Sequence, residues 1–207
     1  MRKLILQEVV TLDGLAAGPN DSVDFVPAAT QGDRSFGEEQ LRLMETVDTI
    51  LLGRVTYAMF AGYWPKAQGE EKTFADKTNA TPRIVFSRTL DRAPWGTWEE
   101  CRIVRGAPPD EVAKLKRQSG KDIVMWGSLS IARSLMHAGM IDEYRLVICP
   151  VVLGEGRPLF GEDVAINMKL LNAKTLDRGA VYLTYAQAGS PSRAASERQE
   201  EHVTAGT

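Results

Sequence analysis

Short apolar runs rich in β-branched residues recur along the chain and predict strands, while the segments between them carry apolar residues at helical spacing. The expected strands cover residues 3–10, 48–52, 83–86, 102–104, 123–126, 144–149, 169–175 and 181–186. The expected helices cover residues 37–46, 55–60, a segment that begins with Asp110 at its N-cap, and 128–137. Strand and helix alternate through most of the chain, and the last two strands follow one another directly.

This order predicts one α/β domain over residues 1–187, with a mostly parallel sheet, helices on both faces and an antiparallel hairpin at its C-terminal edge. Gly139 follows a predicted helix where a left-handed residue is expected. Residues 16–35 form a long polar loop, which points to a functional or mobile segment. Residues 188–207 are almost free of large apolar residues and are expected to form a disordered tail.

Composition and charge narrow the class of protein. The 207 residues are 43% hydrophobic and 25% charged, which is ordinary globular composition. With 25 Lys plus Arg against 27 Asp plus Glu and no basic stripe, nucleic acid is not an expected partner. The longest apolar stretches, such as residues 146–153, fall short of the about twenty residues that a membrane span needs, so no membrane partner is expected. Because the N-terminus lacks the pattern of a secretory signal, we expect a cytoplasmic protein.

Cysteine and histidine are too sparse for a recognisable metal site. Cys101 and Cys149 stand far apart within apolar runs, which favours two buried thiols over a disulfide. His137 and His202 are the only histidines, and no C-x-x-C motif is present. No protein-bound metal is therefore expected.

Three turns at strand ends suit an anionic ligand, because ligands of open α/β sheets bind beyond the carboxyl ends of the strands. Glycine permits close approach of backbone, helix N-termini present free N–H groups, and arginine adds charge. Each glycine also fits plain turn geometry, and Arg88 also fits a solvated surface charge. No G-x-G-x-x-G follows the first strand, so the usual dinucleotide fingerprint is absent. The three turns are Gly53-Arg54-Val55-Thr56, Ser87-Arg88 and Gly127-Ser128.

These motifs in this order resemble the dihydrofolate reductase-like superfamily, within it the reductase domain of riboflavin-biosynthesis deaminase-reductases and its stand-alone relatives. The resemblance runs from about residue 3 to 186 and implies a three-layer fold with an eight-stranded sheet that binds NADPH. It rests on Thr11-Leu12-Asp13-Gly14, Gly53-Arg54-x-Thr56-Tyr57, Gly127-Ser128-x-x-Ile131-Ala132, and the stretch from Asp142 to Phe160. By this resemblance Gly53, Arg54 and Thr56 contact phosphates, Ser87 and Arg88 hold the adenosine 2′-phosphate, and Gly127, Ser128 and Leu129 pack against the pyrophosphate.

The resemblance also suggests residues of the reacting half. Asp13 is the candidate catalytic residue by family position, and an Asp-Gly turn residue is the equal alternative. Glu38 or Glu39 lies near where folate reductases keep an acidic residue, although either also suits a helix N-terminus. Met59, Phe60, Tyr63 and Trp64 follow the Gly-Arg-x-Thr helix and either wall the substrate or belong to the core. Of these we expect Glu38, Phe60 and Trp64 at the substrate.

The expected function is an NADPH-dependent reductase that transfers hydride to a small heterocyclic or carbonyl substrate. The riboflavin enzymes carry a lysine after the first Asp-Gly, where this chain has Leu15-Ala16-Ala17, which weakens the case for the substrate 5-amino-6-(5-phosphoribosylamino)uracil. The zinc deaminase motif is also absent. The alternative is a non-catalytic nucleotide-binding or regulatory module. By family habit, a homodimer paired through the sheet edge is expected.

Overall fold

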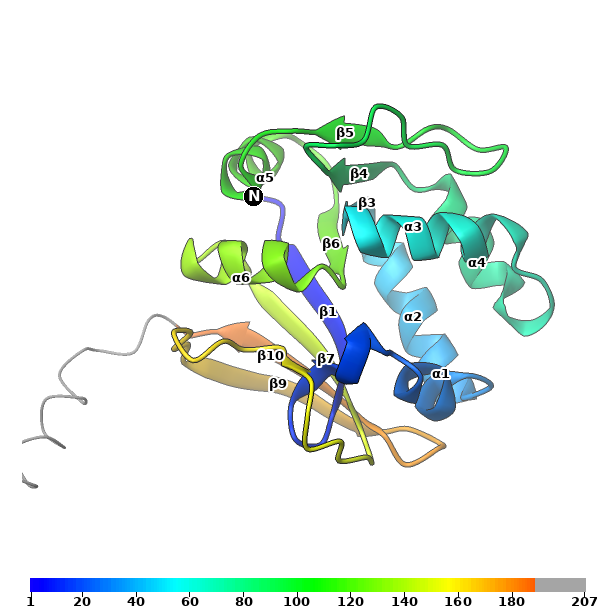
Figure 1. Cartoon of the computed structure of the whole chain (residues 1–207), viewed down its shortest axis with the longest axis vertical. Coiled ribbons are helices and arrows are strands. Elements are labelled where there is room, and N and C mark those ends of the chain that lie inside the picture. The colour runs from blue at the N-terminus through cyan, green and yellow to red at the C-terminus, as the bar shows by residue number, and fades with distance from the viewer. Residues whose placement is uncertain (189–207) are drawn as a thin grey trace, which may run out of the picture.

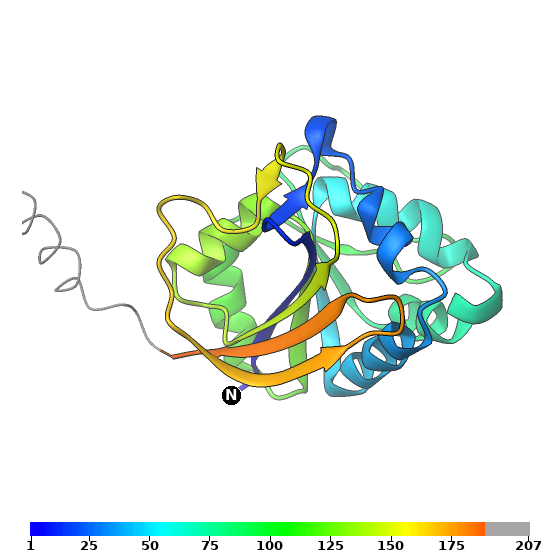
Figure 2. The same cartoon turned by 90° about the horizontal axis from the view of Figure 1, so that it is seen from below.

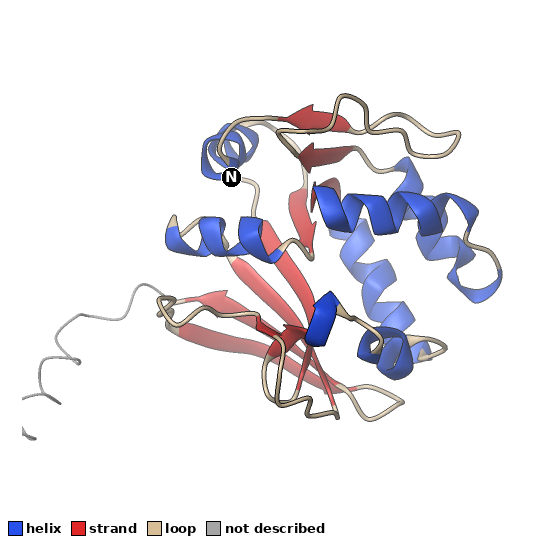
Figure 3. Ribbon diagram, in the orientation of Figure 1, coloured by secondary structure: helices blue, strands red, loops and turns tan. Residues whose placement is uncertain are grey.

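A computed structural model describes residues 1–188, and the tail expected from Gly189 onward lies outside the described residues. The chain forms three layers, with a central sheet between two groups of helices (Figure 1). Helices α5 and α6 cover one face, and α2, α3 and α4 cover the other (Figure 3). The helices are α1 (Phe25–Thr30), α2 (Arg34–Thr46), α3 (Arg54–Tyr63), α4 (Lys72–Ala80), α5 (Pro108–Arg117) and α6 (Leu129–His137).

Eight strands form the main sheet in the order β5-β4-β3-β6-β1-β7-β10-β9. All pairs are parallel except β7 with β10 and β10 with β9, so the predicted mostly parallel sheet with a C-terminal antiparallel hairpin is confirmed. The strands are β1 (Leu4–Thr11), β3 (Val47–Gly53), β4 (Arg83–Phe86), β5 (Arg102–Val104), β6 (Asp122–Trp126), β7 (Glu143–Cys149), β9 (Met168–Thr175) and β10 (Val181–Gln187).

Successive side chains of the central strands point to opposite faces of the sheet, so each strand contributes residues to two separate hydrophobic cores. On β1, Leu4 and Leu6 join the core under α5 and α6, while Ile5 joins the core under α2 and α3. Most central positions of β3, β4 and β6 are fully buried, as expected for strands covered on both faces. Burial on both faces explains why these strands read as continuous apolar runs in the sequence.

The connection expected to be a long loop, residues 16–35, is more ordered than its composition predicts. Its start forms β2 (Leu15–Ala17), which pairs antiparallel with β8 (Arg157–Pro158) (Figure 2). A 3-10 turn (Pro19–Asp21) and α1 follow, and Phe25 and Ala29 of α1 are buried. Pairing with a distant segment explains β2, and burial of Phe25 and Ala29 against Cys149 explains α1.

Two other predictions about helices need correction. Helix α5 begins at Pro108 with Ala107 as its N-cap, because proline is favoured at the first helical position, so Asp110 lies in the first turn and is not the N-cap. Helix α4 was not predicted, since two of its three buried residues are Thr78 and Asn79 and its apolar periodicity is weak. The left-handed residue after α6 is confirmed, with φ of 61° at Gly139.

Candidate functional site

A cavity of about 1330 Å³ opens at the carboxyl ends of the parallel strands. Strands β1 and β6 pair only as far as Gln7 and Trp126, whereas β1 continues beside β7 to Thr11 and Cys149. Beyond Trp126 the chain leaves the sheet through Gly127, so a cleft opens between the two central strands. Such a cleft, where neighbouring strands diverge, is the usual ligand site of an open α/β sheet.

The turns that follow β3 and β6 are joined to each other beside this cleft. The Gly53 amide donates to Ser128 Oγ at 2.6 Å, and Thr56 Oγ1 lies 3.0 Å from the same oxygen. Gly127 has φ of 58° and Ser128 has φ of 64°, so the chain enters α6 in the left-handed region. A Cβ on Gly127 would lie 2.6 Å from Thr56 Oγ1, and one on Gly53 would lie 2.7 Å from Ser128 Oγ. Both positions therefore require glycine.

The end of β4 supplies the third predicted turn. Ser87 is buried, and its Oγ accepts hydrogen bonds from the amides of Thr89 and Leu90 at 3.2 and 3.1 Å. Arg88 is exposed, and its carbonyl accepts from Arg105 Nη1 at 2.8 Å. Arg88 thus lines the cavity from a turn that these hydrogen bonds hold in place.

All eight residues expected at the cofactor and all three expected at the substrate line this one cavity. The structure therefore brings together three turns that lie more than thirty residues apart in the chain. The lining includes Gly53, Arg54, Thr56, Ser87, Arg88, Gly127, Ser128 and Leu129, together with Glu38, Phe60 and Trp64.

An aromatic cluster forms one wall of the cavity. Phe60 and Trp64 meet edge to face with ring centroids 5.9 Å apart, and Trp64 meets Phe74 of α4 at 5.0 Å. Trp126, at the end of β6, lies 6.0 Å from Phe60. These rings pack against the core under α2 and α3 and also face the cavity, so the two roles weighed for Phe60 and Trp64 coexist. Phe74 had no sequence signal because α4 was not predicted.

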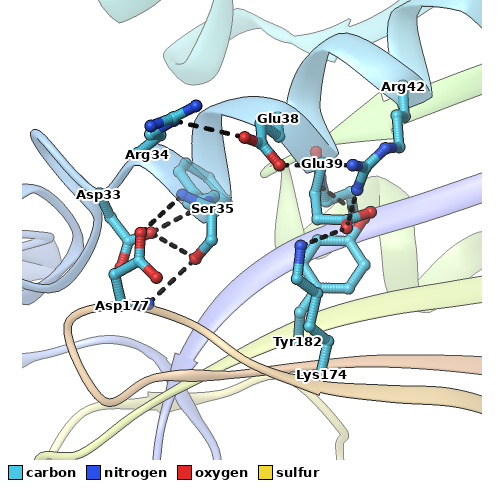
Figure 4. Close-up of polar contacts among 11 residues, drawn as sticks. Asp33, Arg34, Ser35, Glu38, Glu39, Arg42, Lys174, Asp177 and Tyr182 are labelled. Atoms are coloured by element: carbon cyan, nitrogen blue, oxygen red, sulfur yellow. Dashed lines mark hydrogen bonds and ion pairs between the residues drawn. The ribbon is translucent and has the colours of Figure 1, made fainter.

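Helix α2, another wall of the cavity, is fastened to the β9–β10 hairpin (Figure 4). Asp33 caps the helix by accepting from the Phe36 amide at 2.8 Å, and it also accepts from the Arg178 amide at 2.7 Å. Burial opposes ionisation of Asp33, but these bonds and one from the Ser35 hydroxyl outweigh it, so the pKa of Asp33 is lowered. The carboxylate therefore remains a capping anion at neutral pH.

The two acidic candidates on α2 point to different places. Glu38 lines the cavity and forms ion pairs with Arg34 at 3.5 Å and Arg42 at 3.3 Å (Figure 4). Glu39 is absent from the described lining and pairs with Lys174 of β9 at 3.0 Å. Glu39 thus fastens α2 to the hairpin, whereas Glu38 is the acidic residue of this helix that faces the cavity.

Asp13 lies outside the described lining of the cavity. Its carboxylate accepts from the Thr11 hydroxyl at 2.5 Å and from the Gly154 amide at 2.8 Å. These hydrogen bonds lower the pKa of Asp13, which makes it a poor proton donor at neutral pH. The geometry favours a role in holding the loop after β7 over the catalytic role expected from the sequence.

The acidic residue that does reach the cleft floor is Glu8, which the sequence reasoning missed. Glu8 lies on β1 directly after the last residue paired with β6, and it is 9% exposed. Burial raises the pKa of its carboxyl group to about 8, and the Gly127 backbone amide opposes that shift only in part. A charged residue within an apolar strand was the available signal, since buried carboxyl groups are rare.

The family model of the RibD C-terminal domain matches residues 2–182. The chain belongs to this family. Two similar proteins from Bacillus subtilis (strain 168) are uncharacterised. YyaP is 35% identical over 89% of this chain and 94% of its own length, and YwjB is 30% identical over 78% of this chain and 84% of its own length.

Solved structures related to the RibD C-terminal domain show the same fold. A Shewanella sp. PV-4 protein provisionally assigned to riboflavin biosynthesis has a TM-score of 0.70 at 22% identity, covering 90% of this chain and 99% of its own. The Thermotoga maritima deaminase/5-amino-6-(5-phosphoribosylamino)uracil reductase has a TM-score of 0.64 at 12% identity, and the match covers 90% of this chain and 57% of that chain. Dihydrofolate reductase from Enterococcus faecalis, complexed with NADP(H), has a TM-score of 0.54 at 13% identity, and the match covers 90% of this chain and 97% of that chain. The fold is therefore dihydrofolate reductase-like.

No helix in residues 1–188 is long and apolar enough to cross a membrane. The same residues contain no group of His, Cys, Asp and Glu side chains arranged to hold a metal ion.

Proposed function

We propose that the protein is an NADPH-dependent reductase that transfers hydride to a small heterocyclic or carbonyl substrate. The observation that carries this proposal is the meeting of three phosphate-suited turns on one cavity, beside an aromatic wall. Membership of the RibD C-terminal domain family supports a reductase, and the likeness to an NADP(H)-bound dihydrofolate reductase supports a nicotinamide cofactor.

The residues present fit a dinucleotide. Gly53 and Gly127 both line the cavity, and a Cβ at either position would collide with the other turn, so backbone borders the cavity there. The first N–H groups of α3 and α6 suit the pyrophosphate, because helix N-termini present free N–H groups. In α6 these are the N–H groups of Leu129 and Ser130, since the Ile131 N–H donates to the Ser128 carbonyl at 2.8 Å. Arg54 adds a positive charge beside them.

Selectivity for the 2′-phosphate is assigned to Ser87 and Arg88. A guanidinium binds phosphate through paired hydrogen bonds, and NADH lacks that phosphate. The bound cofactor would supply the hydride, while the chain binds it, orients the acceptor and excludes water. The aromatic wall of Phe60 and Trp64 suits a flat acceptor, and Glu38 adds an anionic group near it.

Isothermal titration calorimetry with NADPH and NADH tests the cofactor assignment. We expect NADPH to bind with a Kd well below about 1 mM and NADH to bind more weakly. Absence of NADPH binding would overturn the function, and equal affinities would overturn the role of Ser87 and Arg88.

The substrate is tested by following NADPH oxidation with pterins, pyrimidines, quinones and 5-amino-6-(5-phosphoribosylamino)uracil. Reduction of the last compound is the reaction named for the Thermotoga protein. NADPH binding without oxidation by any member of this panel would favour the alternative, a nucleotide-binding or regulatory module without turnover.

For assembly we propose a cytoplasmic homodimer paired through the sheet edge. Strand β9 is an edge strand, and Leu170 and Leu171 on it are each 51% exposed, so apolar surface is available there. The two cysteines are buried free thiols, which suits a reducing compartment. Light scattering that gives the monomer mass at micromolar concentration would contradict the dimer.

A further inference from the structure

Glu8 occupies the point where the two central strands of the sheet separate. Its neighbour Gln7 is the last β1 residue paired with β6, while Glu8 itself pairs opposite Leu146 of β7. Alternation along β1 places the Glu8 side chain on the face of Leu6 and Val10, toward α6. Glu8 lines the cavity, so its carboxyl group forms part of the cleft floor next to the Gly127 turn.

The carboxyl group has fewer partners than a buried carboxylate requires. Oε1 of Glu8 is buried and makes no hydrogen bond within the described chain. The Gly127 backbone amide is the one hydrogen-bonding group that affects its ionisation. A buried carboxylate without a counter-ion is strongly disfavoured, so the group remains protonated instead. Burial accordingly raises the pKa of Glu8 to about 8, and the side chain is neutral at pH 7.

The charged residues on the elements packed around Glu8 are engaged elsewhere. On α6, Arg133 donates to the Pro158 carbonyl at 2.8 Å. Strand β7 carries Arg145 next to Leu146, but Arg145 donates to Glu143 at 2.7 Å and lies near Tyr182 on the other face of the sheet. Tyr144, on the same face as Glu8, is held neutral because burial raises its pKa. The β6–α6 turn brings Gly127, Ser128 and Leu129, and β2 brings Ala16 and Ala17, all uncharged.

The cations of the cavity lie at its exposed rim and do not perturb Glu8. They are Arg34, Arg54, Arg88 and Arg157. Among the other acidic groups of the lining, Asp33 is committed to the α2 cap, Asp21 pairs with Arg157 at 2.8 Å, and Glu38 pairs with Arg42. Glu70 is exposed, and Glu71 accepts from the Tyr63 hydroxyl. Glu8 is thus the acidic residue of the lining whose protonated carboxyl group is buried in the cleft.

We propose that Glu8 is a charge-compensating acid, a proposal that rests on the reductase function. Its carboxyl group is neutral while the cleft is empty or holds the uncharged reduced nicotinamide. It is ionised when the cationic oxidised ring binds. The physical reason is electrostatic: a cation within a few ångströms favours the carboxylate, and a buried cation requires a nearby anion. Glu8 lines the cavity where β1 and β6 separate, so a nicotinamide ring that enters the cleft between these strands would lie against its carboxyl group.

The same ionisation has a consequence for turnover. Reduction of a C=O or C=N acceptor adds a hydride at carbon, breaks the π bond and requires a proton at the heteroatom. Glu8 is a source of that proton inside the cleft, and its carboxylate regains a proton from water when the oxidised dinucleotide leaves. The charge within the cleft is then balanced before and after the reaction.

The test needs no substrate. Calorimetry measures the Kd of NADP⁺ and of NADPH between about pH 6 and pH 8, in buffers of different ionisation enthalpy. We expect the ratio of the NADP⁺ Kd to the NADPH Kd to rise about tenfold for each pH unit below the pKa of Glu8, because binding the cation must then expel a proton. About one proton is released per NADP⁺ bound at pH 7, and almost none per NADPH. Both dinucleotides carry the 2′-phosphate, so its titration cancels in the ratio.

Glu8→Gln supplies the matched variant, since the amide keeps the shape and cannot ionise. We expect its Kd ratio to be independent of pH. Asp21→Asn removes an ion-paired carboxylate from the same cavity and should retain the wild-type pH dependence. A pH-independent ratio in the wild type, or the same slope in Glu8→Gln, would overturn the proposal. Should Glu8→Gln fail to fold, the wild-type comparison of the two dinucleotides still decides.

A separate measurement distinguishes failure of this proposal from failure of the reductase function. The infrared difference spectrum between ligand-free wild type and Glu8→Gln at pH 7 should show the C=O stretch of a protonated carboxyl group. Its absence overturns the role of Glu8 even when both dinucleotides bind. Absence of dinucleotide binding in the wild type overturns the reductase function and, with it, the compensating role.

Discussion

The backbone N–H of Gly53 donates a hydrogen bond to Ser128 Oγ across 2.6 Å, although the two residues are 75 positions apart in the chain. Thr56 Oγ1 lies 3.0 Å from the same oxygen. One hydroxyl group therefore locks the turn after β3 to the turn after β6. Both turns border the cleft, so their relative position sets the shape of the proposed phosphate site.

Gly53→Ala should disrupt this lock. The added Cβ would lie 2.7 Å from Ser128 Oγ and 3.0 Å from Ile131 Cδ1, and such overpacking costs about 1–3 kcal/mol of unfolding free energy. Urea unfolding measures the loss, and combining the change with Ser128→Ala should recover part of it. Gly62→Ala, in the helix α3 that follows Gly53 and with nothing within 4 Å of its added Cβ, is the control and should be neutral or stabilising. Equal effects of the two glycine substitutions would contradict the lock.

Arg88→Ala should weaken NADPH binding while NADH binding changes little. Loss of a charged hydrogen bond to phosphate is worth about 1.5–3 kcal/mol, or roughly 10- to 100-fold in Kd. Calorimetric titration of each cofactor measures the change. Arg92→Ala, whose exposed guanidinium pairs with Glu100 at 3.0 Å, is the matched control. Equal losses of affinity for NADPH and for NADH would show that Arg88 does not bind the 2′-phosphate.

Asp13→Asn should loosen the loop after β7 without removing cofactor binding. The carboxylate accepts the Gly154 amide at 2.8 Å, and the neutral amide side chain is a weaker acceptor. Hydrogen exchange at Leu153 and Gly154 should become faster, while the NADPH Kd stays within a few-fold of wild type. A variant with normal exchange and normal NADPH binding that no longer oxidises NADPH would instead restore Asp13 to a catalytic role.

Glu8 should contribute to the unfolding free energy of the wild type an amount that falls as pH rises. Because burial raises the pKa of Glu8 to about 8 from the ordinary 4.5, the folded state keeps a proton that the unfolded chain loses between these values. Within that window the unfolding free energy contributed by Glu8 decreases by about 1.4 kcal/mol per pH unit as pH rises. Below the window both states are protonated, and above it both are ionised, so the dependence ends.

The difference in unfolding free energy between wild type and Glu8→Gln, measured in urea at about pH 5.5, 6.5 and 7.5, isolates this component. Other titrating groups are common to both proteins and cancel. A difference that is independent of pH would mean that Glu8 is already ionised in the folded protein.

The local pattern of apolar and polar residues was sufficient to predict the parallel strands and the three turns that follow them. The run at 83–86 was predicted with the bounds that the structure shows for β4, since a strand buried on both faces has a nearly continuous apolar sequence. Glycines at 53 and 127 marked sharp turns, and the sheet then placed both turns at one edge. By contrast, β2 was missed because its pairing partner β8 lies about 140 residues away, and α4 was missed because its buried face includes Thr78 and Asn79.

The sequence by itself determined the order of strands and helices, the family resemblance and the residues of the proposed phosphate turns, because each depends on neighbours in the chain. Tertiary structure decided the roles of the acidic residues. Asp13 and Glu8 lie five positions apart, yet Asp13 accepts amides from a loop about 140 residues away while Glu8 is buried beside Gly127 with an unpartnered oxygen. The ionisation of a carboxyl group depends on the solvent, charges and donors around it, and only the folded chain brings these together.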